Sequence, residues 1–137
     1  MKIFVDTSAW YAIVVSEDQF HQPARDTLVE LLKGGAEFFT TSFVISETYT
    51  LILRRFGNRD ALTYLDFIGK READGIIRII TVERETEKEA RLLLQKYSDR
   101  SFTYVDAVSA VVALKSSMDM IFSFDKHFAI LGFARIP

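Results

Sequence analysis

The sequence contains no cysteine, and it has only two histidines and two prolines among its 137 residues. The missing cysteines exclude disulfide bonds, thiolate metal ligands and cysteine nucleophiles, and they fit a reducing compartment. With a net charge of −2, the protein has no overall basic field to attract nucleic acid, so a polyanionic partner would need a local patch or bound cations. The composition therefore argues against a simple DNA-binding module.

Long hydrophobic runs are also missing. Glu17 and Asp18 interrupt the apolar start too early for a signal peptide or a membrane span. We therefore predict a cytoplasmic protein without a membrane partner. The 137 residues, 49% hydrophobic and 26% charged, suit one well-packed domain over residues 1–137.

Short apolar runs alternate with helical patterns along the chain. The predicted strands are Ile3–Val5, Glu37–Thr41, Ile76–Ile80 and Met120–Phe124, and the tail Gly132–Ile136 allows a short last strand. The predicted helices are His21–Lys33, Ser42–Phe56, Asn58–Ile68, one that begins at Thr86 with a capping box, and Thr103–Ser116. This alternation predicts βαβ units, a parallel sheet and helices on both of its faces.

Four carboxylates stand alone in apolar surroundings. Three of them are the only charged residue in a stretch of 14 or 16 residues, and the fourth directly follows the strand-like segment MIFSF. The four residues are Asp6, Glu47, Asp106 and Asp125. A lone carboxylate in apolar surroundings is costly unless another group pairs with it or uses it.

The positions of these acids predict one common site. Asp6 and Asp125 follow predicted strands, and the binding crevice of an open α/β sheet lies outside the carboxyl ends of its strands. Asp106 lies in the first turn of its predicted helix, and Glu47 lies about a turn and a half into another. Converging carboxylates repel one another without a metal, whereas Mg²⁺ prefers such oxygen ligands.

Each acid also has a structural explanation. Asp6 and Asp125 suit helix N-caps, and Thr103-Tyr-Val-Asp106 fits the capping-box pattern. Glu47 is harder to explain in this way, because its helix is too apolar to present a broad wet face. Taken jointly, the four acids favour a site.

Four segments in this order resemble the PIN domain family and, within it, the VapC-like toxins of toxin–antitoxin pairs. They are VDTSAW, SFVISETY, FTYVDAVSAVVA and FSFDKHF. Each motif is weak alone, but together they are specific and span nearly the whole chain. The family pattern transfers onto Asp6, Glu47, Asp106 and Asp125 as catalytic and metal-site residues, with Ser8 and Ser123 as small polar neighbours and Thr103 as the hydroxyl residue before the third acid.

The resemblance implies a three-layer α/β/α PIN-like fold with a parallel five-stranded sheet in the order 3-2-1-4-5. It also implies an endoribonuclease dependent on Mg²⁺ or Mn²⁺, an RNA substrate, a cognate antitoxin and a homodimer. The expected reaction is hydrolysis of a phosphodiester by a metal-activated water. A free-standing RNA-processing nuclease and a non-catalytic RNA-binding scaffold of the same fold are the alternatives. A phosphatase of the haloacid-dehalogenase type is disfavoured, because its D-x-D-x-T motif has Ser8 at the second position here.

Other residues have weaker claims to a function. His21 and His127 are better explained as surface or capping imidazoles than as general bases. The cations that could contact phosphate, and that solvated helix ends explain equally well, are Arg54, Arg55, Arg59, Lys70, Arg71 and Arg100. The aromatics that could stack on unpaired bases, but whose apolar positions favour the core, are Trp10, Tyr11, Phe102 and Tyr104.

Overall fold

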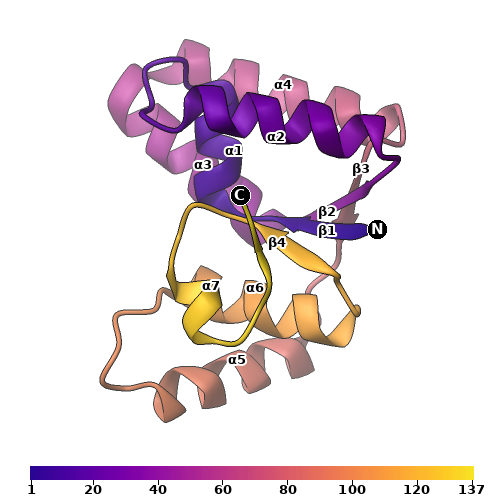
Figure 1. Ribbon diagram of the computed structural model, residues 1–137. Helices are drawn as coiled ribbons and strands as arrows, with labels where there is room; N and C mark the ends of the chain where they lie inside the picture. The colour runs from indigo at the N-terminus through magenta and orange to yellow at the C-terminus, as the bar shows by residue number, and fades with distance from the viewer.

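The computed structural model describes residues 1–137 as a three-layer α/β/α arrangement around one parallel sheet (Figure 1). The strands are β1 (Lys2–Val5), β2 (Glu37–Thr41), β3 (Ile77–Ile80), β4 (Met120–Phe122) and β5 (Arg135–Ile136). Every neighbouring pair is parallel, and the order is β3-β2-β1-β4-β5. The fold class and strand order implied by the resemblance are therefore confirmed.

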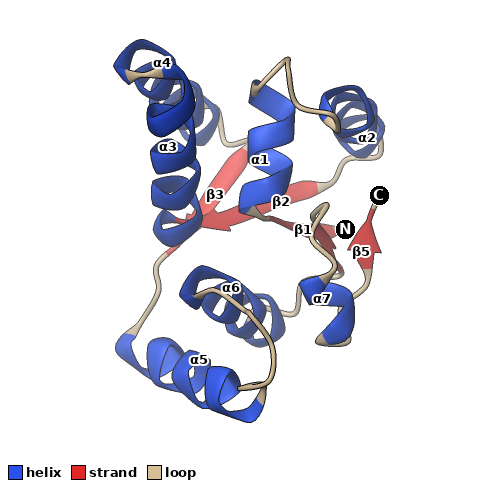
Figure 2. Cartoon of the chain, turned by 90° about the vertical axis from the view of Figure 1, so that its left-hand side faces the viewer, coloured by secondary structure: helices blue, strands red, loops and turns tan.

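Helices cover both faces of the sheet (Figures 1 and 2). On one side lie α1 (Thr7–Val14), α2 (His21–Lys33), α3 (Ser42–Phe56) and α4 (Asn58–Ala73). On the other side lie α5 (Arg84–Lys96), α6 (Tyr104–Lys115) and α7 (His127–Ile130). None of these helices combines the length and apolar character needed to cross a membrane.

The position of β1 at the centre of the sheet explains why apolar and polar residues do not alternate along it. Ile3, Phe4 and Val5 are all fully buried, because helices pack on both faces of β1. In the sheet register, Phe4 lies beside Phe39 of β2 and Ile121 of β4, so three large side chains meet at the centre. This packing holds the end of β1, and with it the next residue, Asp6, in a fixed place at the edge of the sheet.

Two predicted helix boundaries are wrong. The helix that begins at Asn58 does not stop before Gly69 but continues to Ala73, and the chain turns at Gly75 with φ +75°. A glycine inside a helix costs only about 1 kcal/mol relative to alanine, which packing along the helix offsets. The next helix begins at Arg84 rather than at a Thr86 cap, because Thr86 is buried inside its first turn.

Candidate active site

A cleft of about 380 Å³ lies beside the carboxyl ends of the central strands and brings together all four predicted acids. Its lining residues are Asp6, Thr7, Ser8, Tyr11, Asp18, Gln19, Phe20, Glu47, Leu51, Thr103, Asp106, Phe124, Asp125 and His127. No lysine or arginine is among them. The cleft is thus strongly acidic, and a polyanion could enter it only with cations.

Asp6 leaves the end of β1 and caps α1. Its Oδ1 accepts a hydrogen bond from the Ser8 backbone N–H at 3.2 Å, and its Oδ2 accepts from the Ser8 hydroxyl at 3.0 Å. The Ser123 hydroxyl also donates to Oδ2, which joins the end of β1 to the end of β4. The capping explanation is therefore correct for Asp6, and the same carboxylate also lines the cleft.

Burial raises the pKa of Asp6 from its ordinary value of 3.8 to about 7. The hydrogen bonds from Ser123 and Ser8 oppose this rise, and the nearby charge of Asp106 adds to it. With only 4% of its surface exposed, Asp6 has little water to solvate its charge. A nearby cation would favour the ionised carboxylate.

Asp106 belongs to the capping box predicted for its helix. Its Oδ2 accepts from the Thr103 backbone N–H at 2.9 Å, and its own N–H donates to the Thr103 hydroxyl at 3.0 Å. The residue is 7% exposed, and none of the hydrogen bonds in the structure uses its Oδ1. One carboxylate oxygen thus starts α6, while the other is available to a ligand.

Asp125 and His127 share a short turn after β4. The Asp125 backbone N–H donates to the Ser123 hydroxyl at 2.9 Å, and Asp125 Oδ1 accepts the His127 backbone N–H at 2.9 Å. The His127 Nδ1 lies 3.1 Å from Asp106 Oδ2 and 3.4 Å from Asp125 Oδ1. Because carboxylates only accept, this nitrogen carries a hydrogen and donates.

The expectation that His127 is only a surface or capping imidazole therefore misses its position. Its ring packs edge-on against Phe102, with centroids 4.9 Å apart and planes at 75°. The spacing Asp125-Lys126-His127, directly after the predicted strand Met120–Phe124, is the one signal in the sequence that could have placed the imidazole beside the acid.

Glu47 reaches the cleft from the second turn of α3. Its pKa is raised by burial, an effect that the Thr7 hydroxyl opposes and that the charges of Asp106 and Asp125 reinforce. Thr7 is itself 6% exposed, and its Oγ1 is buried without a hydrogen bond of good geometry. The Thr7 hydroxyl therefore faces the Glu47 carboxylate at this wall of the cleft and stabilises its charged form.

The donor set fits a hard divalent cation. One possible ligand atom each from Asp106, Asp125 and His127 lies within 4.8 Å of the others, and His127 would ligate only through the ring nitrogen that carries no hydrogen. Mg²⁺ and Mn²⁺ favour carboxylate oxygens, and Asp6 and Glu47 add two more carboxylates to the same cleft. Burial is the main cause of the raised pKa values of Asp6 and Glu47, and the charges of neighbouring acids add to it.

The other sequence candidates lie mostly outside this cleft. Trp10 is 2% exposed and Phe102 is 9% exposed, so both belong to buried structure. Tyr11 does line the cleft, and its hydroxyl accepts a hydrogen bond from Arg55 Nη1 at 3.0 Å. Arg55 is the only basic candidate with this link, and even it is not a lining residue.

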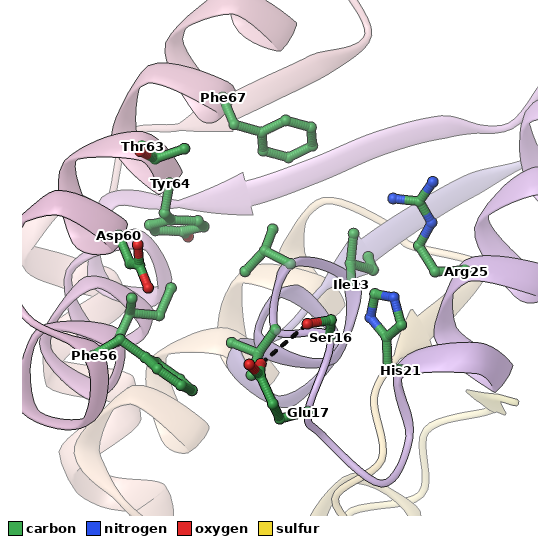
Figure 3. Close-up of a pocket in the computed structure, with 13 residues that line it drawn as sticks. Ile13, Ser16, Glu17, His21, Arg25, Phe56, Asp60, Thr63, Tyr64 and Phe67 are labelled. Atoms are coloured by element: carbon green, nitrogen blue, oxygen red, sulfur yellow. Dashed lines mark hydrogen bonds between the residues drawn. The ribbon is translucent and has the colours of Figure 1, made fainter.

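A second cleft, of about 430 Å³, lies between α1 and α2 on one side and α3 and α4 on the other (Figure 3). Figure 3 shows His21 and Arg25 reaching in from α2, with Tyr64 and Phe67 on the opposite wall. Its apolar lining is Ile13, Val14, Val15, Ile52, Phe56, Tyr64 and Phe67. None of the four predicted acids lies there.

The PIN domain family model matches residues 3–134, so this chain belongs to the PIN domain family. The 23S rRNA-specific endonuclease VapC20 of Mycobacterium tuberculosis is 29% identical over 134 residues, which cover 98% of this chain and 97% of the relative. A VapC ribonuclease of Archaeoglobus fulgidus is 26% identical over 132 residues, which cover 95% of this chain and 81% of the relative.

Solved structures agree with this assignment. The crystal structure of Mycobacterium tuberculosis VapC20, described as a Sarcin-Ricin loop cleaving toxin, superposes with a TM-score of 0.83 at 29% identity and covers 96% of both chains. VapBC2 from Rickettsia felis, bound to a DNA fragment from their promoter, gives a TM-score of 0.72 at 14% identity, with 98% of this chain and 97% of that chain covered. The second likeness shows the shared fold alone.

Proposed function

We propose that this protein is an endoribonuclease that depends on Mg²⁺ or Mn²⁺ and serves as the toxin of a toxin–antitoxin pair. The observation that carries the proposal is the convergence of Asp6, Glu47, Asp106 and Asp125 in one cleft without a lysine or arginine. Such a cleft suits cations and, through them, a phosphodiester. The choice of RNA is supported by the ribonuclease names of two relatives.

In the proposed reaction, the carboxylates of Asp6, Glu47, Asp106 and Asp125 hold the cation. A bound divalent cation supplies an activated water and stabilises charge on the phosphate oxygens. Ser8 and Ser123 fix the Asp6 carboxylate through hydroxyl donors, and His127 fixes Asp106 through its Nδ1–H. These contacts keep the ligands oriented, as outer partners do in other metal sites.

The direct test is cleavage of RNA by purified protein with Mg²⁺, with Mn²⁺ and with excess chelator. The substrates are a hairpin with the sarcin–ricin loop sequence and a hairpin of the same stem with a scrambled loop. We expect cleavage in the unpaired region that stops when the metal is chelated. Cleavage undiminished by chelator would reject the metal mechanism, and RNA binding without cleavage would favour the scaffold alternative.

Two matched variants separate the site from its surroundings. Asp125→Asn removes a charge from the cleft, whereas Asp66→Asn removes one from an exposed pair with Lys70 on α4. We expect Asp125→Asn to lose cleavage and most of the Mn²⁺-induced rise in melting temperature, because Mn²⁺ binds only the folded site. Asp66→Asn should keep both.

The antitoxin belongs to the same proposal. Its support is the description of the relative VapC20 as a toxin, together with the apolar second cleft, which offers a protein partner a surface away from the carboxylates. Co-purification with the product of a small open reading frame directly upstream, with loss of RNA cleavage in that complex, would support it. Without such a gene, a free-standing RNA-processing nuclease is the better description.

A homodimer is also proposed. Leu62 on α4 is 58% exposed and Leu114 on α6 is 72% exposed, so helix faces on both layers offer apolar contacts. Light scattering at high protein concentration tests this, and a monomer under those conditions would refute it.

A further inference from the structure

Two stacked phenylalanines form part of the wall of the acidic cleft. Phe20, in the connection between α1 and α2, lies parallel to Phe124, which follows β4; the ring centroids are 4.6 Å apart and the planes differ by 9°. Phe20 is 39% exposed, and both residues line the cleft with the four carboxylates. An exposed aromatic surface therefore lies beside the proposed reaction site.

Hydrogen bonds tie the backbone of Phe124 to the carboxylate cluster and the backbone of Phe20 to its own turn. The Phe124 backbone N–H donates to the Ser8 hydroxyl at 2.9 Å, and the same hydroxyl donates to Asp6. On the other side, the Phe20 backbone N–H donates to Asp18 Oδ2 at 2.9 Å. The backbones that carry both rings are thus tied by hydrogen bonds to residues that line the cleft.

The charges in the cleft decide which part of a nucleic acid the pair can contact. The lining contains five carboxylates, those of Asp6, Asp18, Glu47, Asp106 and Asp125, and no lysine or arginine. A phosphate can be held there only through cations, and a hard cation such as Mg²⁺ prefers phosphate oxygens to the bases. An unpaired base is uncharged and flat, and it stacks well on an aromatic ring.

We propose that Phe20, supported from behind by Phe124, is the platform on which an unpaired RNA base stacks next to the phosphate held by the metal. This inference rests on the proposed ribonuclease function and adds a substrate contact to it. Every base has a π-face, so the platform selects unpaired over paired RNA rather than one sequence. A base inside a duplex already stacks on its neighbours and gains nothing from the ring.

The test compares a short single-stranded RNA with an abasic oligomer of the same length and charge. Binding of both is measured with Ca²⁺ as the cation, and gel electrophoresis checks that the RNA stays intact. We expect wild-type protein to prefer the RNA. Phe20→Leu, which keeps an apolar side chain but loses the ring, should lower that preference about tenfold and leave binding of the abasic oligomer unchanged.

Two further variants complete the experiment. Phe20→Trp should keep or increase the preference, because the larger ring offers more stacking surface. Leu92→Ala, at a residue 65% exposed on α5 and outside the cleft, should leave binding of both oligomers unchanged.

Two results would overturn the inference. One is a wild-type protein that does not distinguish RNA from the abasic oligomer. The other is a Phe20→Leu protein that keeps the preference, including one that has lost only its binding to an antitoxin. Failure of the proposed function would appear separately, as absence of cleavage with Mn²⁺ whatever the outcome for binding.

Discussion

The protein has two clefts of similar volume, about 380 and 430 Å³, and each contains one of its two histidines. In the acidic cleft, His127 Nδ1 lies beside two carboxylates, that of Asp125 in its own turn and that of Asp106 on α6. In the second cleft, the His21 Nδ1 donates to the carbonyl of Ala12 at 2.7 Å, a contact between neighbouring elements. One imidazole thus serves a charged cluster, and the other fastens the start of α2 to α1.

The difference shows that volume does not identify the chemical site. The larger cleft lies among helices and has a mostly apolar lining. Its two acids are Glu17 and Asp60. The smaller one lies at the carboxyl ends of the strands, where backbone geometry gathers residues from the end of β1, from α1, α3 and α6, and from the turn after β4. Position in the sheet and density of charge therefore separate proposed chemistry from proposed partner binding.

The sharpest contrast between the clefts comes from Asp6→Asn and Glu17→Gln. We expect no detectable RNA cleavage from Asp6→Asn, because the amide cannot supply the charge that holds a cation. The variant should fold, because asparagine caps helices about as well as aspartate and the Ser8 and Ser123 hydroxyls can accept as well as donate. Glu17→Gln should cleave like wild type. Retained cleavage in Asp6→Asn at saturating Mn²⁺ would leave Asp6 with a capping role alone.

The second prediction concerns stability without metal. Because the pKa of Asp6 is about 7 in the folded protein and 3.8 ordinarily, the folded state binds more protons than the unfolded state between these values. The free energy of unfolding should therefore fall as pH rises through this window. Asp6→Asn has no carboxylate to titrate at this position and so avoids this loss of stability. At pH 8 in chelator, its free energy of unfolding should exceed that of wild type by an amount on the order of 4 kcal/mol.

Urea unfolding of both proteins at pH 5 and pH 8 measures this difference. The raised pKa of Glu47 acts in the same direction in both proteins and cancels in the comparison. If Asp6→Asn is less stable than wild type at both pH values, the hydrogen bonds that the Ser8 and Ser123 hydroxyls donate to the carboxylate outweigh the cost of burying its charge.

The third prediction contrasts the two histidines. His127→Ala should raise the Mn²⁺ concentration needed for half-maximal cleavage about tenfold, because Asp106 loses the donor that orients it. His127→Gln can still donate a hydrogen bond, so its Mn²⁺ concentration for half-maximal cleavage should lie between those of wild type and His127→Ala. His21→Ala should lose about 1 kcal/mol of stability but keep the wild-type Mn²⁺ dependence. Identical Mn²⁺ curves for all these proteins would remove His127 from the site.

The sequence predicts most of the fold because local signals and packing agree. Buried runs such as Ile3–Val5 predict central parallel strands, and Gly57 marks the end of α3 with φ +91°. Gly69 gives the wrong helix end, because a single glycine resembles a stop signal but costs too little to end a well-packed helix. Helix boundaries depend on such small differences.

The candidate site, like the fold, has features that local sequence predicts and features that depend on tertiary contacts. The four acids that line the cleft stand out in the sequence, because a charge isolated in an apolar segment is costly unless another group pairs with it or uses it. The sequence does not show which side chains from different elements contact one another in the folded protein. Only the spacing Asp125-Lys126-His127 sets His127 apart from His21 in the chain, and Phe20 stacks on Phe124 across more than 100 positions. Only the folded arrangement distinguishes these side chains from ordinary surface or core residues.

The prediction with the smallest expected effect tests whether residues of the second cleft contribute to RNA cleavage. Asp60 lines that cleft and lies in the first turn of α4, a helix whose N-cap, Gly57, provides no side-chain cap. Asp60→Asn removes a negative charge from the positive end of the helix dipole, which should lower stability by about 0.5 kcal/mol, less at high salt. RNA cleavage should stay within about twofold of wild type, because an exposed charge outside the acidic cleft is screened by solvent. The matched variant Asp66→Asn, in the middle of α4, should change stability less, since an exposed pair with Lys70 contributes little. If Asp60→Asn instead lost cleavage to the extent of Asp125→Asn, the two clefts would form one functional surface, and their separation into a chemical site and a partner site would be wrong.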